Sequence, residues 1–166
     1  MTFADILAGS AVFLDANTFI YHFIADPAYG PACTALLDRI EHQEVQGFTS
    51  AHVLGELVHR LMTLEAQQRF GWLAAGMAHR LKRHPAEVQK LSWNKRGVDE
   101  VRAVGVQVLP VDGADVSRAV DICGQHGLLT NDALIVVLMK RYNLAQLASL
   151  DTGFDRVPNL TRFAPV

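Results

Sequence analysis

The sequence has little of what marks a secreted or membrane-spanning protein. Its only 2 cysteines, Cys33 and Cys123, lie far apart in apolar segments, so we expect small core residues rather than a disulfide or zinc site. The longest apolar run, residues 133–139, is well short of the ~20 residues that cross a bilayer. Residues 1–11 contain no lysine or arginine, which argues against a signal peptide. We therefore expect a cytoplasmic protein with no membrane segment.

An excess of either charge is also missing. The 15 basic and 17 acidic residues give a net charge of -2, which does not by itself indicate a nucleic-acid binder or an acidic tail. With 50% hydrophobic residues in 166 positions, the chain can bury a core without disulfides or a structural metal. Neither repeats nor low-complexity segments occur, and we expect one domain over residues 1–166.

Positive charge is concentrated in one part of the chain. Residues 60–102 contain nine lysines and arginines but only four acids. This stretch is either a solvated helical face or an edge that contacts the phosphates of RNA. Three aromatic residues in it, Phe70, Trp72 and Trp93, could stack on bases, but helical spacing favours core packing. The candidate RNA-binding residues are Arg80, Lys82, Arg83, Lys95 and Arg96.

Short apolar runs alternate with longer segments of helical periodicity. The runs predicted as strands are 11–14, 45–49, 104–111 and 144–150, with a further short strand near 160–163. The segments predicted as helices are 31–44, 51–64, 67–82, 114–125 and 132–142. This order predicts an α/β fold of three layers, in which helices cover a central, mostly parallel sheet of four to five strands. A helical, basic elaboration is expected at about 66–97, with Pro85 and Gly97 in its second half.

Two acids follow predicted strands. Asp15 comes directly after 11–14 and Asp151 ends the run 144–150, and ligands of open parallel sheets bind beyond the carboxyl ends of the strands. Each also has a structural interpretation. Asp15 could cap a helix, although Asn17 is the better placed cap, and Asp151 could form an Asx turn with Gly153.

Two further acids fall on predicted helices near the same edge. Asp132 lies in the first turn of a helix capped by Thr130 or Asn131, where the helix dipole stabilises an acid. Glu56 lies on the polar face of the helix that follows the second strand, about one turn from its start. Taken alone, each has an ordinary structural explanation.

Together, the four acids suggest a cation site. Carboxylates a few ångströms apart repel one another, so a cluster persists near neutral pH only with protons or cations between them. Oxygen ligands in a hydrated site suit Mg²⁺ or Mn²⁺, one or two of which could activate water for attack on a phosphodiester.

Four short segments carry a resemblance to a known family. Residues 13–20, 49–57, 129–135 and 149–155 match, in order and spacing, the motifs of PIN-domain ribonucleases. The organisation is most similar to the VapC-type toxins of prokaryotic toxin–antitoxin pairs. Ser149 stands where the family commonly has threonine, and it keeps the hydroxyl.

The resemblance implies a catalytic and a metal-binding role for the acids Asp15, Glu56, Asp132 and Asp151. It also implies supporting roles for Asn17, Asn131 and Ser149 and leaves Asp155 equally open to a surface role. The activity implied is Mg²⁺- or Mn²⁺-dependent cleavage of RNA to 5′-phosphate and 3′-hydroxyl ends. The partners implied are a second copy of the chain, in a homodimer, and an inhibitory antitoxin from a separate gene.

Three alternatives remain open at this level. A haloacid-dehalogenase-like phosphatase would use Asp15 and the pair Asp151 and Asp155, with Thr49 or Ser50 on phosphate, but Asn17 cannot serve as its general acid. A di-iron bundle would need two Glu-x-x-His motifs, whereas only the one formed by Glu56 and His59 occurs. A non-catalytic RNA- or protein-binding module of the same fold would have the same sequence pattern.

Overall fold

A five-stranded parallel sheet forms the centre of the molecule. The structure, a computed structural model, describes residues 1–166. The strands are β1 (Ala11–Leu14), β2 (Gln46–Ser50), β3 (Gln107–Leu109), β4 (Gln146–Ala148) and β5 (Thr161–Phe163). Their order is β3-β2-β1-β4-β5, and every neighbouring pair is parallel. The predicted α/β fold is confirmed, and the strands within 104–111 and 144–150 are shorter than predicted.

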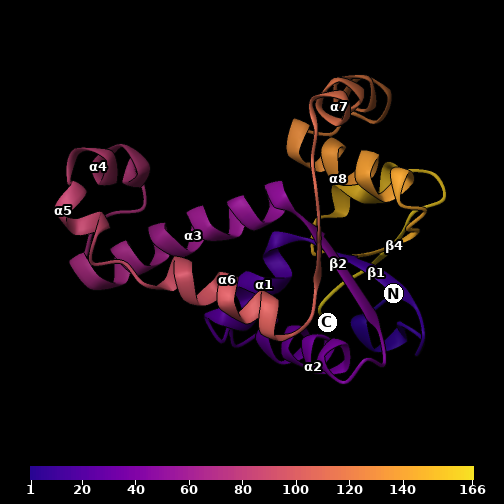
Figure 1. The fold of residues 1–166 in the computed structure, drawn as a ribbon, viewed down its shortest axis with the longest axis horizontal. Coiled ribbons are helices and arrows are strands. Elements are labelled where there is room, and N and C mark those ends of the chain that lie inside the picture. The colour runs from indigo at the N-terminus through magenta and orange to yellow at the C-terminus, as the bar shows by residue number, and fades with distance from the viewer.

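Helices cover both faces of this sheet (Figure 1). Alternate residues of β1 point to opposite faces, so Phe13 packs in one apolar cluster and Val12 and Leu14 pack in another. The cluster around Phe13 includes residues of α7 (Gly113–His126) and α8 (Thr130–Arg141). The other face is covered by α2 (Gly30–Glu41), α3 (Ala51–Phe70) and α6 (Trp93–Ala103).

The remaining helices are short. They are α1 (Ala16–Phe23), α4 (Met77–Arg83), α5 (Pro85–Val88) and the 3-10 turns η1 (Phe3–Asp5) and η2 (Thr152–Arg156). No single helix combines the length and apolarity needed to span a membrane, and the one pair that does so jointly, α7 with α8, is bent by 108°.

The prediction of one helix over 67–82 is wrong. α3 ends at Phe70 because Gly71 takes a left-handed conformation, with φ of 64°, and its N–H closes the helix on the carbonyl of Gln67. Gly76 is also left-handed, with φ of 71°, and α4 begins immediately after it. The helical spacing of apolar residues therefore continues across residues 71–76, where the helix itself is interrupted.

The predicted elaboration contains a protruding part, residues 71–92, which we call the basic arm. Figure 1 shows its helices α4 and α5 at the far end of α3, away from the sheet. Met77 and Leu81 of the arm bury their side chains against Ala66 of α3, with Phe70 and Trp72 around them. Residues 93–97 instead begin α6, which packs along α3. The aromatic residues are thus packed, as helical spacing favoured.

Candidate active site

The acids predicted from the sequence come from elements that meet at one edge of the sheet. Asp15 directly follows β1, and Asp151 follows β4 by a few residues. The ends of these strands are neighbours, since Leu14 pairs with Ala148 in the register of β1 and β4. The carboxyl edge of the sheet is where parallel α/β proteins bind their ligands.

Asp15 is a buried carboxylate held by three donors. Only 8% of its surface is exposed, and Oδ1 accepts a hydrogen bond from the Ala16 N–H at 2.7 Å. Its Oδ2 accepts from Asn17 Nδ2 at 2.6 Å and from Ser149 Oγ at 2.7 Å. The expectation that Asn17 caps the following helix is wrong, because Asp15 itself is the N-cap of α1 and Asn17 binds its carboxylate.

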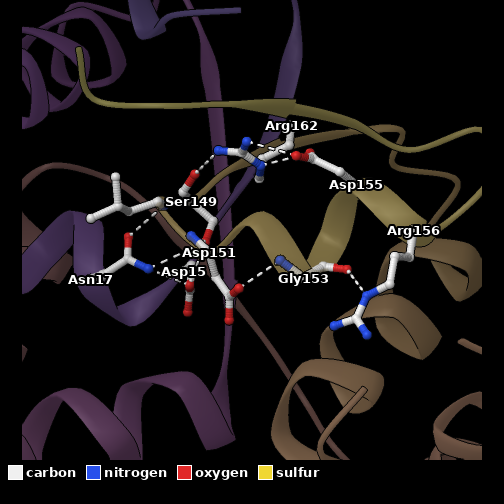
Figure 2. A network of polar contacts seen from close by, with 9 residues as sticks. Asp15, Asn17, Ser149, Asp151, Gly153, Asp155, Arg156 and Arg162 are labelled. Carbon is white, nitrogen blue, oxygen red and sulfur yellow. Dashed lines mark hydrogen bonds and ion pairs between the residues drawn. The ribbon is translucent and has the colours of Figure 1, made fainter. Parts of the chain in front are cut away.

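Ser149 and Asn17 join the ends of β1 and β4, as Figure 2 shows. Besides donating to Asp15, Ser149 Oγ accepts from the backbone N–H of Asp151 at 3.0 Å. Asn17 Oδ1 accepts from the N–H of Leu150 at 3.3 Å. The two polar side chains therefore fix the position of Asp15 relative to the segment that carries Asp151.

Glu56 and Asp132 lie on the helices that flank this edge. The exposed Glu56 of α3 is 3.5 Å from Asn131 Nδ2, which donates to its carboxylate, and Asp132 is the next residue along α8. The expected capping of α8 by Thr130 or Asn131 is wrong, because Leu129 occupies the N-cap position without a side-chain hydrogen bond. The side chain of Asn131 is turned toward Glu56 instead.

His52, in the first turn of α3, links two elements at this edge. Its ring is hydrogen-bonded to Ser50 Oγ at 2.8 Å through Nδ1 and to the carbonyl of Asn131 at 3.3 Å through Nε2. Burial lowers the pKa of His52, and the bond to Asn131 opposes that shift. A neutral ring that donates to the Asn131 carbonyl would tie the start of α3 to the start of α8.

The acids at this edge have raised pKa values and no ion-pair partners. The pKa of Asp15 is raised to about 6. Burial is the largest cause, the bonds from Ser149 and Ala16 oppose it, and the charges of Glu56 and Asp132 add to it. Burial likewise raises the pKa of Asp132, with Asp151 and Glu56 adding to the effect. None of the four acids forms an ion pair with a lysine or arginine.

The carboxylate of Asp155 is directed at Arg162 rather than at Asp15 or Asp151 (Figure 2). Its two oxygens accept from Arg162 at 2.8 and 2.9 Å, and Arg162 Nη1 donates to the carbonyl of Ser149 at 3.1 Å. The bonds from Arg162 lower the pKa of Asp155. Its carboxylate is thus engaged in holding β5 and η2 against the segment after β4.

A divalent cation is chemically compatible with this edge. No three His, Cys, Asp or Glu side chains converge closely enough to form a complete ligand set. Mg²⁺ does not require one, because it retains several waters and binds proteins through one or two carboxylates. The buried, unpaired charge of Asp15 beside other acids is the environment that such a hydrated ion would stabilise.

The candidate RNA-binding residues lie on exposed surfaces along α3 rather than at the acidic edge. Arg80, Lys82 and Arg83 belong to α4 of the basic arm, and Lys95 and Arg96 belong to α6. Two are seated on aromatic rings, since the Arg80 guanidinium is 5.4 Å from the centre of Trp72 and that of Arg96 is 5.3 Å from the centre of Phe23. All five side chains are exposed.

Comparison with known proteins agrees with this geometry. The PIN domain family model matches residues 12–160. The chain belongs to the PIN domain family. This PIN domain is 26% identical over 146 residues to Ribonuclease VapC2 of Methanocaldococcus jannaschii, and the match covers 88% of each chain.

Solved structures show the same fold. The PIN domain superposes on Mycobacterium tuberculosis VapC20, a toxin that cleaves the sarcin-ricin loop, with a TM-score of 0.62 and 17% identity over 93% of this chain and 98% of that one. It superposes on Rickettsia felis VapBC2, solved with a DNA fragment of its promoter, with a TM-score of 0.59 and 16% identity over the same shares. The predicted PIN-like architecture is thereby confirmed.

Proposed function

We propose that the protein is an endoribonuclease toxin of the VapC type, with Asp15, Glu56, Asp132 and Asp151 as its metal-binding catalytic acids. The observation that carries the proposal is the buried Asp15 carboxylate, which has acidic neighbours and no cationic partner. A site that concentrates negative charge for a structural purpose would pair it with arginine or lysine, whereas a metal-dependent nuclease must leave it free for the ion.

The cofactor proposed is Mg²⁺ or Mn²⁺, as one or two ions. When bound, the ion would lower the pKa of a water and neutralise charge on the phosphate. The protein's own contribution is to orient the acids: Ser149 and Asn17 hold Asp15, and Asn131 contacts Glu56. Because these donors are already in place, the acids need little rearrangement to receive the ion.

The proposed partners are RNA, an antitoxin encoded by a separate gene, and a second copy of the chain in a homodimer. The support for an antitoxin is the likeness to VapBC2 of Rickettsia felis and to a toxin–antitoxin complex from Klebsiella pneumoniae, with a TM-score of 0.56. The basic arm and the start of α6 would contact RNA beyond the cleavage site. A cytoplasmic location stays a prediction from the sequence.

The phosphatase alternative has little support in the structure. It would need the hydroxyl of Thr49 or Ser50 to bind phosphate, but both side chains are fully buried. Thr49 Oγ1 donates to the carbonyl of Leu14, and Ser50 Oγ accepts from the N–H of Val53 as the N-cap of α3. The Thr49 hydroxyl links β2 to β1 and the Ser50 hydroxyl caps α3, so both already have a structural partner.

The proposed function is tested by incubating the purified protein with a structured RNA mixture in Mg²⁺, in Mn²⁺ and in EDTA. We expect cleavage only with a metal, with 5′-phosphate ends, and none by the Asp132→Ala variant. Cleavage that persists in EDTA or in the variant would refute the assignment of the acids. Binding of RNA without cleavage under any metal would favour the non-catalytic module.

A further inference from the structure

Two arginines flank the acidic edge, and their hydrogen bonding differs (Figure 2). Each of the three nitrogens of Arg162 donates to the protein, because Nε and Nη2 donate to Asp155 and Nη1 donates to the Ser149 carbonyl. Arg156 makes a single hydrogen bond, from Nε to the carbonyl of Gly153 at 3.1 Å. Both of its terminal nitrogens lack a protein acceptor, so they remain available for a ligand.

The position of the Arg156 guanidinium is nevertheless well defined. Gly153 accepts from Arg156 through its carbonyl and donates its N–H to Asp151 Oδ1 at 2.7 Å, so one glycine orients both a proposed catalytic acid and the arginine. A Cβ atom at Gly153 would lie 3.0 Å from Asp151 Oδ1 and 3.1 Å from Arg156 Nη2. One at Gly127 would lie 3.3 Å from Arg156 Nη1. The guanidinium thus lies close against two glycines.

Arg156 lies beside the acids but forms no ion pair with them. Gly153 bonds to Arg156 through its carbonyl and to Asp151 through its N–H, yet Arg156 forms no ion pair with any carboxylate. A cation held beside an acidic edge, with free donors, can receive an anion that also approaches the acids. A phosphate of the RNA backbone is such an anion.

We propose that Arg156 binds a non-bridging oxygen of a substrate phosphate next to the acidic edge, and that Gly153 is the residue that positions it. This inference rests on the proposed ribonuclease function. It adds a contact that reads the RNA backbone rather than a base, since a guanidinium at a phosphate carries no sequence information. Arg162, whose charge is paired with Asp155 and whose three nitrogens each already donate to the protein, is not assigned such a role.

The test measures the affinity of a fluorescent single-stranded RNA as a function of salt, in EDTA so that no cleavage occurs. Losing one phosphate contact should reduce the slope of log affinity against log salt by about 0.7 for single strands. We expect Arg156→Gln to show this reduction and to bind about 10-fold more weakly at low salt. Arg156→Lys should keep the slope, because it keeps the charge.

Two further variants separate the contact from a general effect of charge or folding. Lys140→Gln removes an exposed cation at the opposite end of α8 from Asp132, about 12 Å along the helix, and should bind RNA like the wild type. Gly153→Ala keeps the arginine but displaces it, and should weaken binding like Arg156→Gln. Thermal unfolding of each variant verifies that it is folded.

An unchanged slope and affinity in Arg156→Gln would overturn the inference, as would an equal loss in Lys140→Gln. Failure of the proposed function has a different signature. In that case the wild type would bind RNA with a slope that depends on Arg156 but would not cleave it in Mg²⁺ or Mn²⁺. Cleavage by the wild type together with wild-type binding by Arg156→Gln would remove only the arginine's role.

Discussion

At the scale of single residues, burying the charged Asp15 carboxylate costs the fold stability, although the proposed function requires that charge. Its carboxylate is buried, and its ordinary pKa of 3.8 rises to about 6. The folded state therefore binds a proton more tightly than the unfolded state, so this residue's contribution to stability is full below about pH 4 and is lost as the pH rises through 6. The difference corresponds to about 3 kcal/mol at most. Such a cost is consistent with a residue kept for its charge.

This conflict predicts a specific behaviour of Asp15→Asn. The metal-free wild type should lose stability between about pH 4 and 6, and the variant should lose much less because an amide does not titrate. Cleavage should fall by about 100-fold or more in the variant, while its fold is retained. Thermal unfolding in EDTA across this pH range and a cleavage assay provide the measurements.

Asp121→Asn is the matched control, because Asp121 is an exposed acid on α7, outside the acidic edge. It should keep full activity and the wild-type pH dependence of stability. If the stability of Asp15→Asn depends on pH as that of the wild type does, the burial of this carboxylate is not the cause of the wild type's loss of stability.

Ser149 offers a second prediction at this scale. Replacing it with alanine removes the donor to Asp15 Oδ2 and leaves the partly buried Asp151 N–H without an acceptor, which should destabilise the protein by about 1–3 kcal/mol. The lost donor should also raise the pKa of Asp15, so the acid side of the activity profile should move to higher pH. A pH profile of kcat/KM and urea unfolding would detect both effects.

Ser117→Ala removes an exposed hydroxyl of α7 and should change neither quantity. Ser149→Thr, which keeps the hydroxyl, should retain the wild-type profile. An alanine variant with an unshifted profile would show that Ser149 supports the backbone without acting on Asp15.

The candidate acids and the polar residues near them could be named from the sequence, but the contacts between them could not. Asp15, Asp132 and Asp151 stand in short motifs at the ends of predicted elements, and their convergence follows from a parallel sheet. The expectation that Asn17 caps the following helix was wrong, because which residue caps a helix depends on the φ and ψ of the neighbouring backbone. Arg156 was not a candidate from the sequence, because a single arginine outside a motif or a charge cluster indicates no site.

At the scale of elements, the junction of α3 and α6 depends on one buried acid. Glu65 has 5% of its surface exposed, and its Oε2 accepts from the N–H groups of Ser92 and Trp93, each at 2.8 Å. These donors lie at the start of α6, where helical N–H groups lack partners. A glutamate in the middle of one helix thus caps another, which hydrophobic periodicity could not indicate.

We therefore expect Glu65→Ala to destabilise the protein by about 1–3 kcal/mol, because the N–H groups of Ser92 and Trp93 would lose their acceptor. Glu65→Gln keeps one carbonyl oxygen and should cost less. Urea unfolding measures the difference, and Glu87→Gln, which alters a contact with Lys90 within the basic arm, should have little effect. Equal stability of Glu65→Ala and Glu87→Gln would contradict the capping role.

The break after α3 shows the limit of periodicity at this scale. Ala66, Met77 and Leu81 have the apolar character of one continuous helix, and they do pack together. Gly71 and Gly76 take left-handed conformations that end one helix and start the next, so the same apolar residues meet through a folded-back arm. The three layers and the parallel sheet, which follow from the alternation of apolar strands and amphipathic helices, were predicted correctly, whereas the order of the strands was not predicted.

At the scale of the whole molecule, negative and positive charge are separated along α3. Glu56 lies at the end of α3 near the sheet, and the basic arm begins after Phe70, about 20 Å further along the helix axis. RNA long enough to reach from one to the other would be held by phosphate contacts on the arm, whereas a short oligonucleotide at the acidic edge would not reach it.

This separation predicts that the effect of the arm depends on RNA length. Replacing Arg80, Lys82 and Arg83 with glutamate should weaken the binding of an oligonucleotide of about 16 nucleotides and flatten its salt dependence. Binding of one of about 4 nucleotides should be nearly unaffected. Lys140→Glu, a charge reversal on the opposite side of the sheet, is the control for a general change in net charge.

Because Arg156 is proposed to act at the acidic edge, Arg156→Gln should weaken the binding of both oligonucleotides. The two experiments together locate the RNA on the protein surface. An unchanged salt slope for the long oligonucleotide in the arm variant would show that the arm faces away from the substrate. Equal weakening of both lengths by the arm variant would mean that RNA approaches the acids from the side of α4. Only a loss confined to the long strand fits a path along α3.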